Sequence, residues 1–410
     1  MQYVIIGNSA AGVGCVEGIR QADKTGKITV LSSEPYHTYS RPLISYLLYG
    51  KTDEEKMKYR RASFYEDNGC EFLPGRTAAA IDPKGKTVRL TDGTEIPYDR
   101  LMVATGSRPF VPPIPGLDRV SSQFTFMSLD DARALEKELS PDKRVLIMGA
   151  GLIGLKCAEG IAAKVGELTV VDLAPHILPS ILDPDAAALV QKHIEGHNIR
   201  FILSDSVKEF SGNAAVLASG KTVPFDILIV AVGVRPNTAL ISDAGGAVNR
   251  GIVTDDACRT TLPDIFAAGD CTESRDAVSG EHRVLALLPN AYMQGECAGI
   301  NMAGGTAVYD KAIAMNAIGF FGLHVLTAGS YQGEDYISAG EETYKRLISS
   351  DNRLRGFILV GDVARAGIYT NLIKNKTALS SIDYDLIKER PQLLAFSRKE
   401  RKIMLGGAAE

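Results

Sequence analysis

The same pattern of strand, glycine turn, helix and strand occurs twice in this chain. The first copy starts at Tyr3-Val-Ile-Ile-Gly7, continues through Asn8-Ser-Ala-Ala-Gly12 into a helix-like stretch, and ends near Glu34. The second copy starts at Arg144, passes through Gly149-Ala-Gly-Leu-Ile-Gly154 and ends at Asp172. Self-similarity of this kind constrains the architecture strongly. It predicts two similar nucleotide-binding units in one chain.

The spacing of the small residues has a physical reason. In such a unit the first glycine allows a tight turn, the second lets a pyrophosphate approach the backbone, and the third lets the helix pack against the strand. The pyrophosphate lies at the positive N-terminus of the helix. An acidic residue about 20 positions later accepts hydrogen bonds from ribose hydroxyls. The matching residues are Gly7, Ser9, Ala10, Ala11, Gly12 and Glu34 in the first copy, and Gly149, Gly151, Leu152, Ile153, Gly154 and Asp172 in the second.

A second repeated pair supports the same interpretation and helps to divide the chain. Ala104-Thr-Gly-Ser-Arg-Pro109 and Ala231-Val-Gly-Val-Arg-Pro236 each follow a short apolar strand. We expect an α/β protein with two Rossmann-like dinucleotide-binding domains and a small α+β C-terminal domain. The predicted boundaries are 1–110 with 238–308 for the first binding domain, 111–237 for the second, and 309–410 for the C-terminal domain.

Composition excludes several classes of function. The 45 basic and 49 acidic residues give a net charge of −4, which argues against a nucleic-acid-binding protein. No apolar run approaches the ~18–20 residues of a membrane span, and the opening MQYVIIGNSAAG leaves no room for a signal peptide. The six cysteines form neither a CxxC pair nor a zinc-type cluster. We therefore expect a reduced, cytoplasmic protein that binds neither nucleic acid nor membrane.

Taken together, these motifs resemble those of the pyridine nucleotide–disulfide oxidoreductases in the broad sense. GNSAAG with Glu34 looks like the FAD motif of that family, ATGSRP at 104–109 like its ATG motif, and TLPDIFAAGD at 261–270 like its second FAD motif. GAGLIG with Asp172 looks like the NAD(P)H motif, closed by AVGVRPN at 231–237. The resemblance implies FAD contacts at Ala104, Thr105, Gly106, Arg108, Gly269 and Asp270, and NADH contacts at Val232 and Gly233.

Three further segments are similar to one branch of that family, the NADH:rubredoxin oxidoreductases and nitrite reductase flavoproteins. They are Tyr39-Ser-Arg-Pro-Leu-Ile-Ser45, Leu288-Pro-Asn-Ala-Tyr-Met-Gln-Gly295 and Met315-Asn-Ala-Ile-Gly-Phe-Phe-Gly322. Flavoprotein subunits of some anaerobic aldehyde or 2-oxoacid oxidoreductase complexes are also similar. The resemblance implies that Arg41 and Pro42 lie along FAD, that Pro289 and Asn290 lie near the isoalloxazine, and that Ala78 is a further contact.

Two departures from the family pattern bear on mechanism. Relatives that use a thiol carry a cysteine after the first acidic residue, and the corresponding stretch here, Tyr39–Gly50, contains none. A disulfide reductase is therefore disfavoured. Many relatives also keep a Lys–Glu pair beside flavin N5. Here Tyr46 stands in the lysine place and Lys156 in the glutamate place, so we expect these two residues near the reacting rings.

The resemblance and the departures give one functional hypothesis. We expect an FAD-dependent oxidoreductase that transfers electrons between NADH and a one-electron partner such as rubredoxin, ferredoxin or an iron–sulfur or metalloenzyme subunit. Asp172 should favour NADH over NADPH, because a carboxylate repels a 2′-phosphate. Two alternatives remain: an NADH oxidase that reduces oxygen, and a flavoprotein subunit of an aldehyde or 2-oxoacid oxidoreductase complex. For each of these functions the chain could form a homo- or hetero-oligomer.

Simpler interpretations apply to other residues. Cys15 and Cys157 are expected to pack a helix against a sheet, and Cys271 to take no part in redox chemistry. His193 and His197 are expected on a solvent-facing helix surface, since zinc needs three or four ligands. The basic residues of the C-terminal domain are expected to lie over the flavin edge, where an acidic electron carrier would dock. They are Lys388, Arg390, Arg398, Lys399, Arg401 and Lys402.

Overall fold

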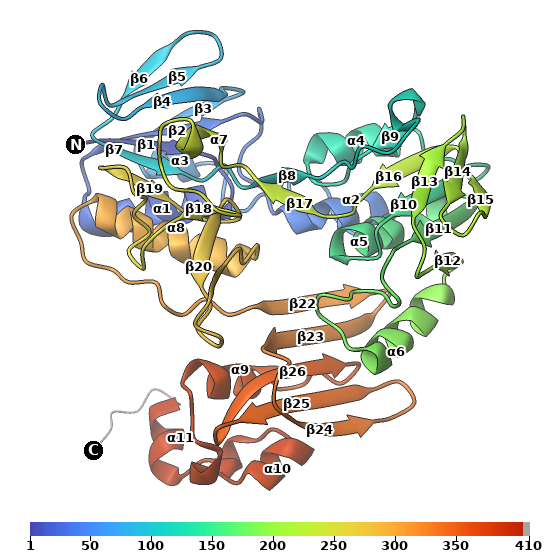
Figure 1. The fold of residues 1–410 in the computed structure, drawn as a ribbon. Helices are drawn as coiled ribbons and strands as arrows, with labels where there is room; N and C mark the ends of the chain where they lie inside the picture. Colours follow the sequence, from blue (N-terminus) through green and yellow to red (C-terminus); the bar gives the residue numbers. More distant parts are fainter. Residues whose placement is uncertain (405–410) are drawn as a thin grey trace.

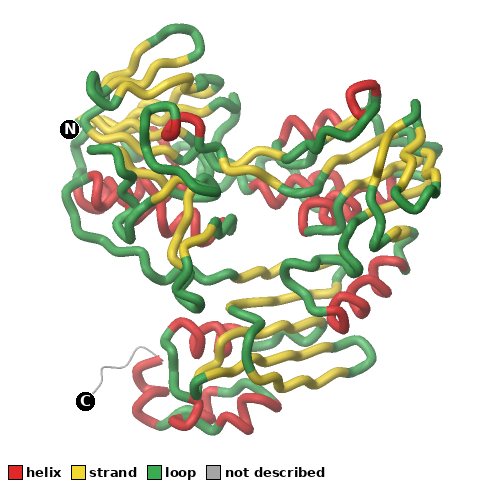
Figure 2. Tube along the Cα trace, in the orientation of Figure 1, coloured by secondary structure: helices red, strands yellow, loops and turns green. Residues whose placement is uncertain are grey.

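The computed structural model describes residues 1–404 and contains three five-stranded sheets. In Figure 1 the first sheet lies at the upper left, the second at the upper right and the third below them. Two sheets are parallel and the third is antiparallel; Figure 2 shows their strands in yellow. The predicted fold class, two Rossmann-like units with a smaller α+β part, is confirmed.

The first sheet is built around the first copy of the repeat. Helices α1 (Ala10–Ala22) and α8 (Leu288–Met302) cover one face. A small antiparallel sheet of β4 (Ala78–Asp82), β5 (Thr87–Leu90) and β6 (Glu95–Pro97) covers the other. The main sheet has the order β19 (Ile265–Ala267), β7 (Arg100–Val103), β1 (Gln2–Ile6), β2 (Lys27–Ser32), β3 (Cys70–Pro74).

The second sheet repeats this plan. Helices α4 (Leu129–Glu136), α5 (Leu152–Ile161) and α6 (Pro184–Glu195) belong to the core on one face. The antiparallel strands β13 (Val207–Phe210), β14 (Ala214–Leu217) and β15 (Thr222–Pro224) cover the other. The main sheet has the order β12 (Ile199–Ile202), β11 (Glu167–Val171), β10 (Arg144–Met148), β16 (Ile227–Val230), β9 (Gln123–Phe124).

The two units are joined by the second repeated pair of motifs. Strands β8 (Ser107–Pro109) and β17 (Val234–Pro236) pair antiparallel, so that Arg108 lies opposite Arg235. Figure 1 shows this two-stranded bridge between the two parallel sheets. The two similar motifs therefore form the two paired chain segments that connect the first unit with the second.

The third sheet packs on both sides. One face packs against α9 (Ala366–Lys374), through residues such as Phe357 and Tyr369. The other face contributes Phe320, Val325 and Ile358 to the core of the second unit. The sheet order is β22 (Met315–Phe320), β23 (Leu323–Gly329), β26 (Arg353–Val360), β25 (Tyr344–Ser350), β24 (Glu334–Ala339), and α10 (Tyr384–Glu389) and α11 (Arg398–Met404) follow.

Helices α1 and α8 approach each other through glycines. A Cβ atom built on Gly18 would lie 2.2 Å from the carbonyl oxygen of Glu296, and one on Gly299 would lie 2.2 Å from that of Cys15. Gly14 and Gly295 are equally close to the facing backbone. Only glycine therefore fits along this contact. It brings the N-termini of α1 and α8 to the same side of the sheet, where both helices line a cavity.

The histidine pair of α6 is partly solvent-facing, as expected, since His197 is exposed and His193 half-buried, but it also contacts the third sheet. His197 stacks on the Phe321 ring at a centroid distance of 3.9 Å, and His193 Nε2 lies 3.4 Å from the Phe321 carbonyl oxygen. The histidine pair therefore contacts the β22–β23 turn rather than only solvent, because the third sheet packs on α6. Within residues 1–404, no helix is both long enough and apolar enough to cross a membrane. The domain boundaries stay a prediction.

Candidate functional site

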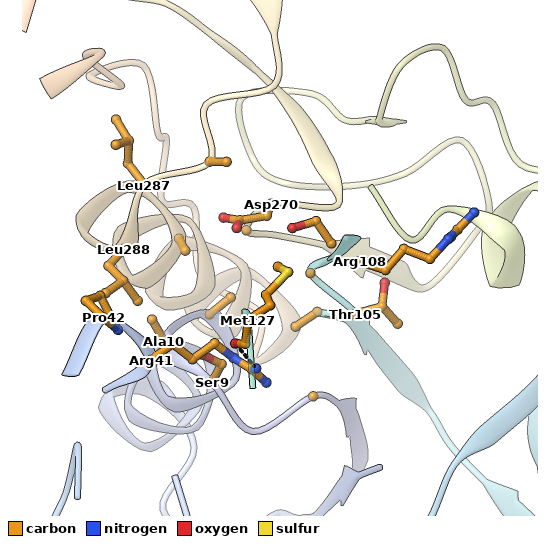
Figure 3. A pocket seen from close by; sticks show the side chains of 18 of the residues that line it. Ser9, Ala10, Arg41, Pro42, Thr105, Arg108, Met127, Asp270, Leu287 and Leu288 are labelled. Carbon is orange, nitrogen blue, oxygen red and sulfur yellow. Dashed lines mark hydrogen bonds between the residues drawn. The ribbon is translucent and has the colours of Figure 1, made fainter. Parts of the chain in front are cut away.

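A large cavity lies where the first unit, the second unit and the third sheet meet. Its volume is about 1030 Å³, at the upper end of what small-molecule sites enclose. The carboxyl ends of β1, β2 and β7 and the N-termini of α1, α5 and α8 open into it. Figure 3 shows Asp270, Thr105 and Met127 around the same space, with Arg41 and Pro42 nearby. Such a position beyond the strand ends is where open α/β sheets bind ligands.

The first glycine turn has the geometry that a phosphate needs. Gly7 has φ +115°, and a Cβ there would lie 2.2 Å from the Ala104 carbonyl oxygen. Helix α1 follows with Ser9 as its N-cap, and no side chain caps its first turn. The N–H groups of that turn therefore face the cavity wall at Ser9, Ala10 and Ala11, and an anion can bind them. These residues fit the pyrophosphate of FAD.

Gly12 has a different role from Ser9. It does not line the cavity, and a Cβ on it would lie 2.0 Å from the Gly7 carbonyl oxygen. It allows the close approach of helix and strand that the third glycine of the motif requires.

Glu34 lines the cavity, and its carboxylate has two protein partners. It forms an ion pair with Arg41 and accepts a hydrogen bond from the Tyr39 hydroxyl at 2.7 Å. Arg41 also donates to the Met127 carbonyl oxygen at 3.2 Å, a contact drawn in Figure 3. Arg41 therefore connects the first unit to the segment that precedes α4, and it brings a positive charge to the wall beside the first turn of α1.

Asp270 is, with Glu34, one of the acidic residues that line the cavity. Within residues 1–404 its carboxylate accepts no hydrogen bond, although it lines the cavity. Burial raises the pKa of Asp270, and the nearby Arg41 opposes that rise. A carboxylate without a protein donor fits a ligand that supplies hydroxyl groups, such as the ribityl chain of FAD. The backbone N–H of Gly269 donates to Gln294 Oε1 at 2.9 Å, so Gln294, which sequence reasoning missed, holds this turn.

The second glycine turn copies the first. Gly149 has φ +110°, a Cβ there would lie 2.3 Å from the Ala231 carbonyl oxygen, and one on Gly154 would lie 2.0 Å from that of Gly149. The Asp172 carboxylate accepts hydrogen bonds from the N–H groups of Ala150 at 2.6 Å and Ala174 at 2.7 Å. These bonds fix Asp172 beside the turn, where each oxygen keeps a further lone pair for a ribose hydroxyl.

The two predicted nucleotide sites meet at one wall. Leu152 and Ile153, from the second turn, line the same cavity as the first turn. The other predicted residues of the second unit lie outside the cavity lining, at the carboxyl ends of β10, β11 and β16; they are Gly149, Gly151, Gly154, Asp172, Val232 and Gly233. Leu152 and Ile153 therefore connect the second glycine turn to the cavity wall that the first turn also lines.

Lys156 and Tyr46, the two residues predicted to lie near the reacting rings, contact each other. Lys156 Nζ lies 4.4 Å from the centroid of the Tyr46 ring, and both residues line the cavity. Lys156 forms an ion pair with Glu159 one helical turn later and donates to the Gly319 carbonyl oxygen at 3.1 Å. Glu159 also accepts from the Phe321 N–H at 2.7 Å. Lys156 therefore stands where α2 (Ile44–Tyr49), α5 and β22 meet.

The predicted FAD contacts differ in whether they line the cavity. Asn290 does not line the cavity: it is 3% exposed, donates to the Ile313 carbonyl oxygen and accepts from the Tyr309 hydroxyl at 2.8 Å. Its neighbour Pro289 does line it, because adjacent helical residues point about 100° apart. The remaining predicted FAD contacts also lie on the wall; they are Pro42, Ala78, Ala104, Thr105, Gly106, Arg108 and Gly269.

The third sheet supplies a wall that sequence reasoning did not assign by residue. Met315–Gly319 of β22, with His324 and Leu326 of β23, line the cavity. The expectation that the C-terminal basic residues lie over it is wrong. No residue between 327 and 404 lines the cavity, and Figure 1 shows α10 and α11 at the far end of the third sheet from β22. Lys388 instead pairs with Asp385 and lies over Tyr384 and Tyr336.

The cysteines lie away from the cavity. Cys271 is fully buried behind the Gly269 turn, and its thiol donates to the carbonyl oxygens of Ala268 and Val103. Burial raises the pKa of Cys271. Cys15 and Cys157 are also fully buried, in the cores beside the first and second sheets. These three thiols are positioned as packing groups.

Comparisons with known proteins agree with this geometry. The family model described as pyridine nucleotide-disulphide oxidoreductase matches residues 1–295. The chain is 34% identical over 316 residues to an NADH oxidase of Methanocaldococcus jannaschii, covering 74% of this chain and 70% of that protein. It is 29% identical over 394 residues to the NADH-dependent phenylglyoxylate dehydrogenase subunit epsilon of Aromatoleum evansii, covering 93% of each.

Other similar proteins are longer or known by structure. The nitrite reductase [NAD(P)H] of Bacillus subtilis is 31% identical over 392 residues, and this chain, 92% of which is matched, spans 48% of its length. A crystal structure of a ferredoxin reductase from Rhodopseudomonas palustris is 26% identical with a TM-score of 0.85, covering 92% of this chain and 95% of that one.

Proposed function

Because the chain belongs to the pyridine nucleotide-disulphide oxidoreductase family, we propose that it oxidises NADH with FAD and passes the electrons to a one-electron acceptor. The acceptor is a rubredoxin, a ferredoxin, or an iron–sulfur or metalloenzyme subunit. The observation that carries the proposal is the cavity itself. It joins a free helix N-terminus, an unpartnered carboxylate and the second glycine turn, and its wall contains no cysteine among residues 1–404.

Different residues of the cavity bind different parts of FAD. The first turn of α1 binds the pyrophosphate, with Arg41 supplying a countercharge, and Asp270 binds the ribityl hydroxyls. Glu34 binds the ribose hydroxyls of FAD. FAD, when bound, accepts two electrons as a hydride and releases them one at a time; the protein supplies position and electrostatics. Asp172 binds the NADH ribose and selects against a 2′-phosphate.

Lys156 and Tyr46 act at the reacting end of the cavity. Both line the same cavity as Leu152 and Ile153, which supports a cation and a phenol ring where the two proposed nucleotide sites meet. Glu159 and the Gly319 carbonyl hold Lys156 there. A fixed cation at this point favours negative charge on the bound ring system, since the surroundings are partly desolvated. We assign Glu159 as a residue that positions Lys156.

Two other functions have specific support. The similarity to an NADH oxidase favours oxygen as an acceptor. The match to a dehydrogenase subunit along almost its full length favours a non-autonomous subunit that docks a metalloenzyme partner. For either role we propose three domains, with FAD bound by 1–110 and 238–308, NADH by 111–237, and the cavity capped by 309–410, in a cytoplasmic protein.

Steady-state kinetics with several acceptors test the proposal. The FAD-loaded protein is given NADH and, in turn, a rubredoxin, a ferredoxin and oxygen. We expect reduction of at least one iron–sulfur acceptor to outpace oxygen consumption. An oxygen rate equal to or above that of every carrier tried would replace the proposal with the NADH oxidase alternative.

A further inference from the structure

His324 is a titratable residue of the cavity wall that the proposed chemistry does not use. It lies near the start of β23, directly opposite Gly319 of β22. The third sheet ends at β22, and Figure 1 shows this strand as the part of the sheet nearest to the other two units. Among residues 1–404, no other histidine lines the cavity. The wall therefore contains an imidazole with no assigned role.

The alternation of side chains along β23 turns His324 toward the cavity. His324 and Leu326 are two residues apart, so they point to the same face of the sheet, and both line the cavity. Val325, between them, points the other way and packs in the core of the second unit. A Cβ atom built on Gly319 would lie 3.4 Å from His324 Nδ1, so the imidazole lies against this glycine.

Gly319 connects His324 with the reacting end of the cavity. The Gly319 carbonyl oxygen accepts the 3.1 Å hydrogen bond from Lys156 Nζ. On the other side of β23, the Gly361 N–H donates to the His324 carbonyl oxygen at 2.9 Å, and the exposed Asp362 follows Gly361. His324 is itself exposed, and within residues 1–404 its ring has no hydrogen-bond partner. Both ring nitrogens are therefore available for proton transfer.

The stoichiometry of the proposed function, on which this inference rests, leaves one proton to be removed. A hydride consists of two electrons and one proton, whereas a one-electron acceptor takes only electrons. Oxidation of one NADH by two acceptor molecules therefore gives NAD⁺, two reduced acceptors and one proton. That proton must pass from the bound cofactor to water. A base at the cavity wall speeds a transfer of this kind by about 10²–10⁴-fold.

The cationic groups of the wall cannot accept this proton. Arg41, Arg76 and Arg108 line the cavity, and a guanidinium stays protonated in proteins. Lys156 is held in an ion pair by Glu159, so its ammonium group already carries its full set of protons.

The remaining ionisable groups of the wall are engaged or weakly basic. Glu34 is paired with Arg41, and Asp270 faces the ribityl chain in the proposed function. Tyr46 carries a phenol, which is a weak base. An imidazole, in contrast, ordinarily gains and loses a proton near neutral pH. His324 is therefore the group on this wall that is best suited to accept the proton.

We propose that His324 is the proton acceptor of the reaction. Its neutral imidazole takes up the proton that remains at the bound cofactor when the electrons leave, and then releases it to water. One N–H bond forms on the imidazole while the bond between that proton and the cofactor breaks. Release of the proton to water restores the neutral ring for the next turnover.

Chemical labelling tests the position of His324 without NADH or an acceptor. Diethyl pyrocarbonate is added to the protein with and without FAD, and the carbethoxylation of each histidine is measured by mass spectrometry. We expect FAD to reduce the labelling of His324 several-fold. The labelling of His282, which is exposed and does not line the cavity, should stay constant. Equal labelling of His324 with and without FAD would overturn the proposal.

Stopped-flow oxidation tests the transfer itself. The FAD-loaded protein is reduced with dithionite, freed of excess reagent and mixed with ferricyanide, a one-electron oxidant. In His324→Gln we expect the oxidation rate to fall by about 10²-fold, and imidazole added to the buffer should restore much of it. His282→Gln is the matched control and should behave as the unchanged protein does. Retained FAD stoichiometry shows that each variant is folded.

Two results of the stopped-flow experiment would refute the role of His324. One is an oxidation rate in His324→Gln equal to that in His282→Gln, and the other is a slower rate that imidazole does not raise. Both experiments need only bound FAD. A preference for oxygen over every iron–sulfur carrier would therefore contradict the proposed function without changing their results.

Discussion

Replacing Gly18 with alanine should destabilise the first unit by separating α1 from α8. The added methyl group would lie 2.2 Å from the Glu296 carbonyl oxygen, more than 1 Å inside the 3.4 Å at which ordinary van der Waals contact begins. The obstacle is backbone, so no side chain can move aside. Overpacking of this kind costs about 1–3 kcal/mol, and we take the upper end because α1 and α8 are held by four such contacts.

An opposing effect reduces this cost. Alanine is about 1 kcal/mol more favourable than glycine inside a helix, so the net destabilisation of Gly18→Ala should be about 2 kcal/mol. For a unit of this size, that lowers Tm by about 4–8 °C. The assay is thermal unfolding followed both by circular dichroism and by the rise of flavin fluorescence on release, since α1 and α8 both open into the cavity.

The control is Gly367→Ala in α9, where nothing lies within 4 Å of the added methyl group. Only the gain in helix propensity applies there, so Tm should stay constant or rise. The double variant Gly18→Ala with Gly299→Ala should cost less than the sum of the single variants, because one separation relieves both contacts. A Gly18→Ala protein as stable as Gly367→Ala would refute the reasoning.

Three further outcomes follow from the site. NADH should be preferred over NADPH by at least about tenfold in kcat/KM, or about 1.4 kcal/mol, and equal use of both would remove Asp172 from its assigned role. Asp270→Ala should lower FAD occupancy on dilution by leaving ribityl hydroxyls unpaired, at about 1–3 kcal/mol, whereas full retention of FAD would contradict this. Hydrogen bonds from Arg144 lower the pKa of Asp226 to about 2. Its stabilising effect is therefore complete above the unfolded pKa of about 3.9 and is lost as the pH falls toward 2. The Tm difference between the unchanged protein and Asp226→Asn should accordingly shrink from pH 5 to pH 3, and a constant difference would argue against it.

The parts of the site that depend on local chain geometry could be predicted from the sequence. Gly7 and Gly149 have a left-handed backbone and lie close to the backbone after a neighbouring strand of the sheet. Both requirements favour glycine, so the sequence itself marks these two positions. The sequence did not predict as well which residues of α8 face the cavity. Pro289 and Asn290 are neighbours in the motif, but helical rotation turns one to the cavity and the other to the Tyr309 hydroxyl.

Contacts between segments far apart in the sequence could not be predicted as well. The wall formed by β22 and β23 depends on how the third sheet packs on α5 and α6, which no short pattern encodes. The same packing explains why the basic residues of α10 and α11 lie away from the cavity: the sheet separates them from it. Lys156 and Tyr46 were paired through their places in the family motifs, but the role of Glu159 emerged only from the position of the Phe321 N–H.

The contact between α1 and α8 has a consequence for synthesis on the ribosome. All strands of the second sheet lie between residues 123 and 230, so that sheet can form while the chain is still being made. The first sheet must wait for β19 at 265–267, and α1 must wait for α8, which ends at residue 302. Because domains generally fold as units when their segments emerge, the unit that begins the chain should finish folding after the unit that interrupts it. Until then, the apolar face of α1 is available to chaperones.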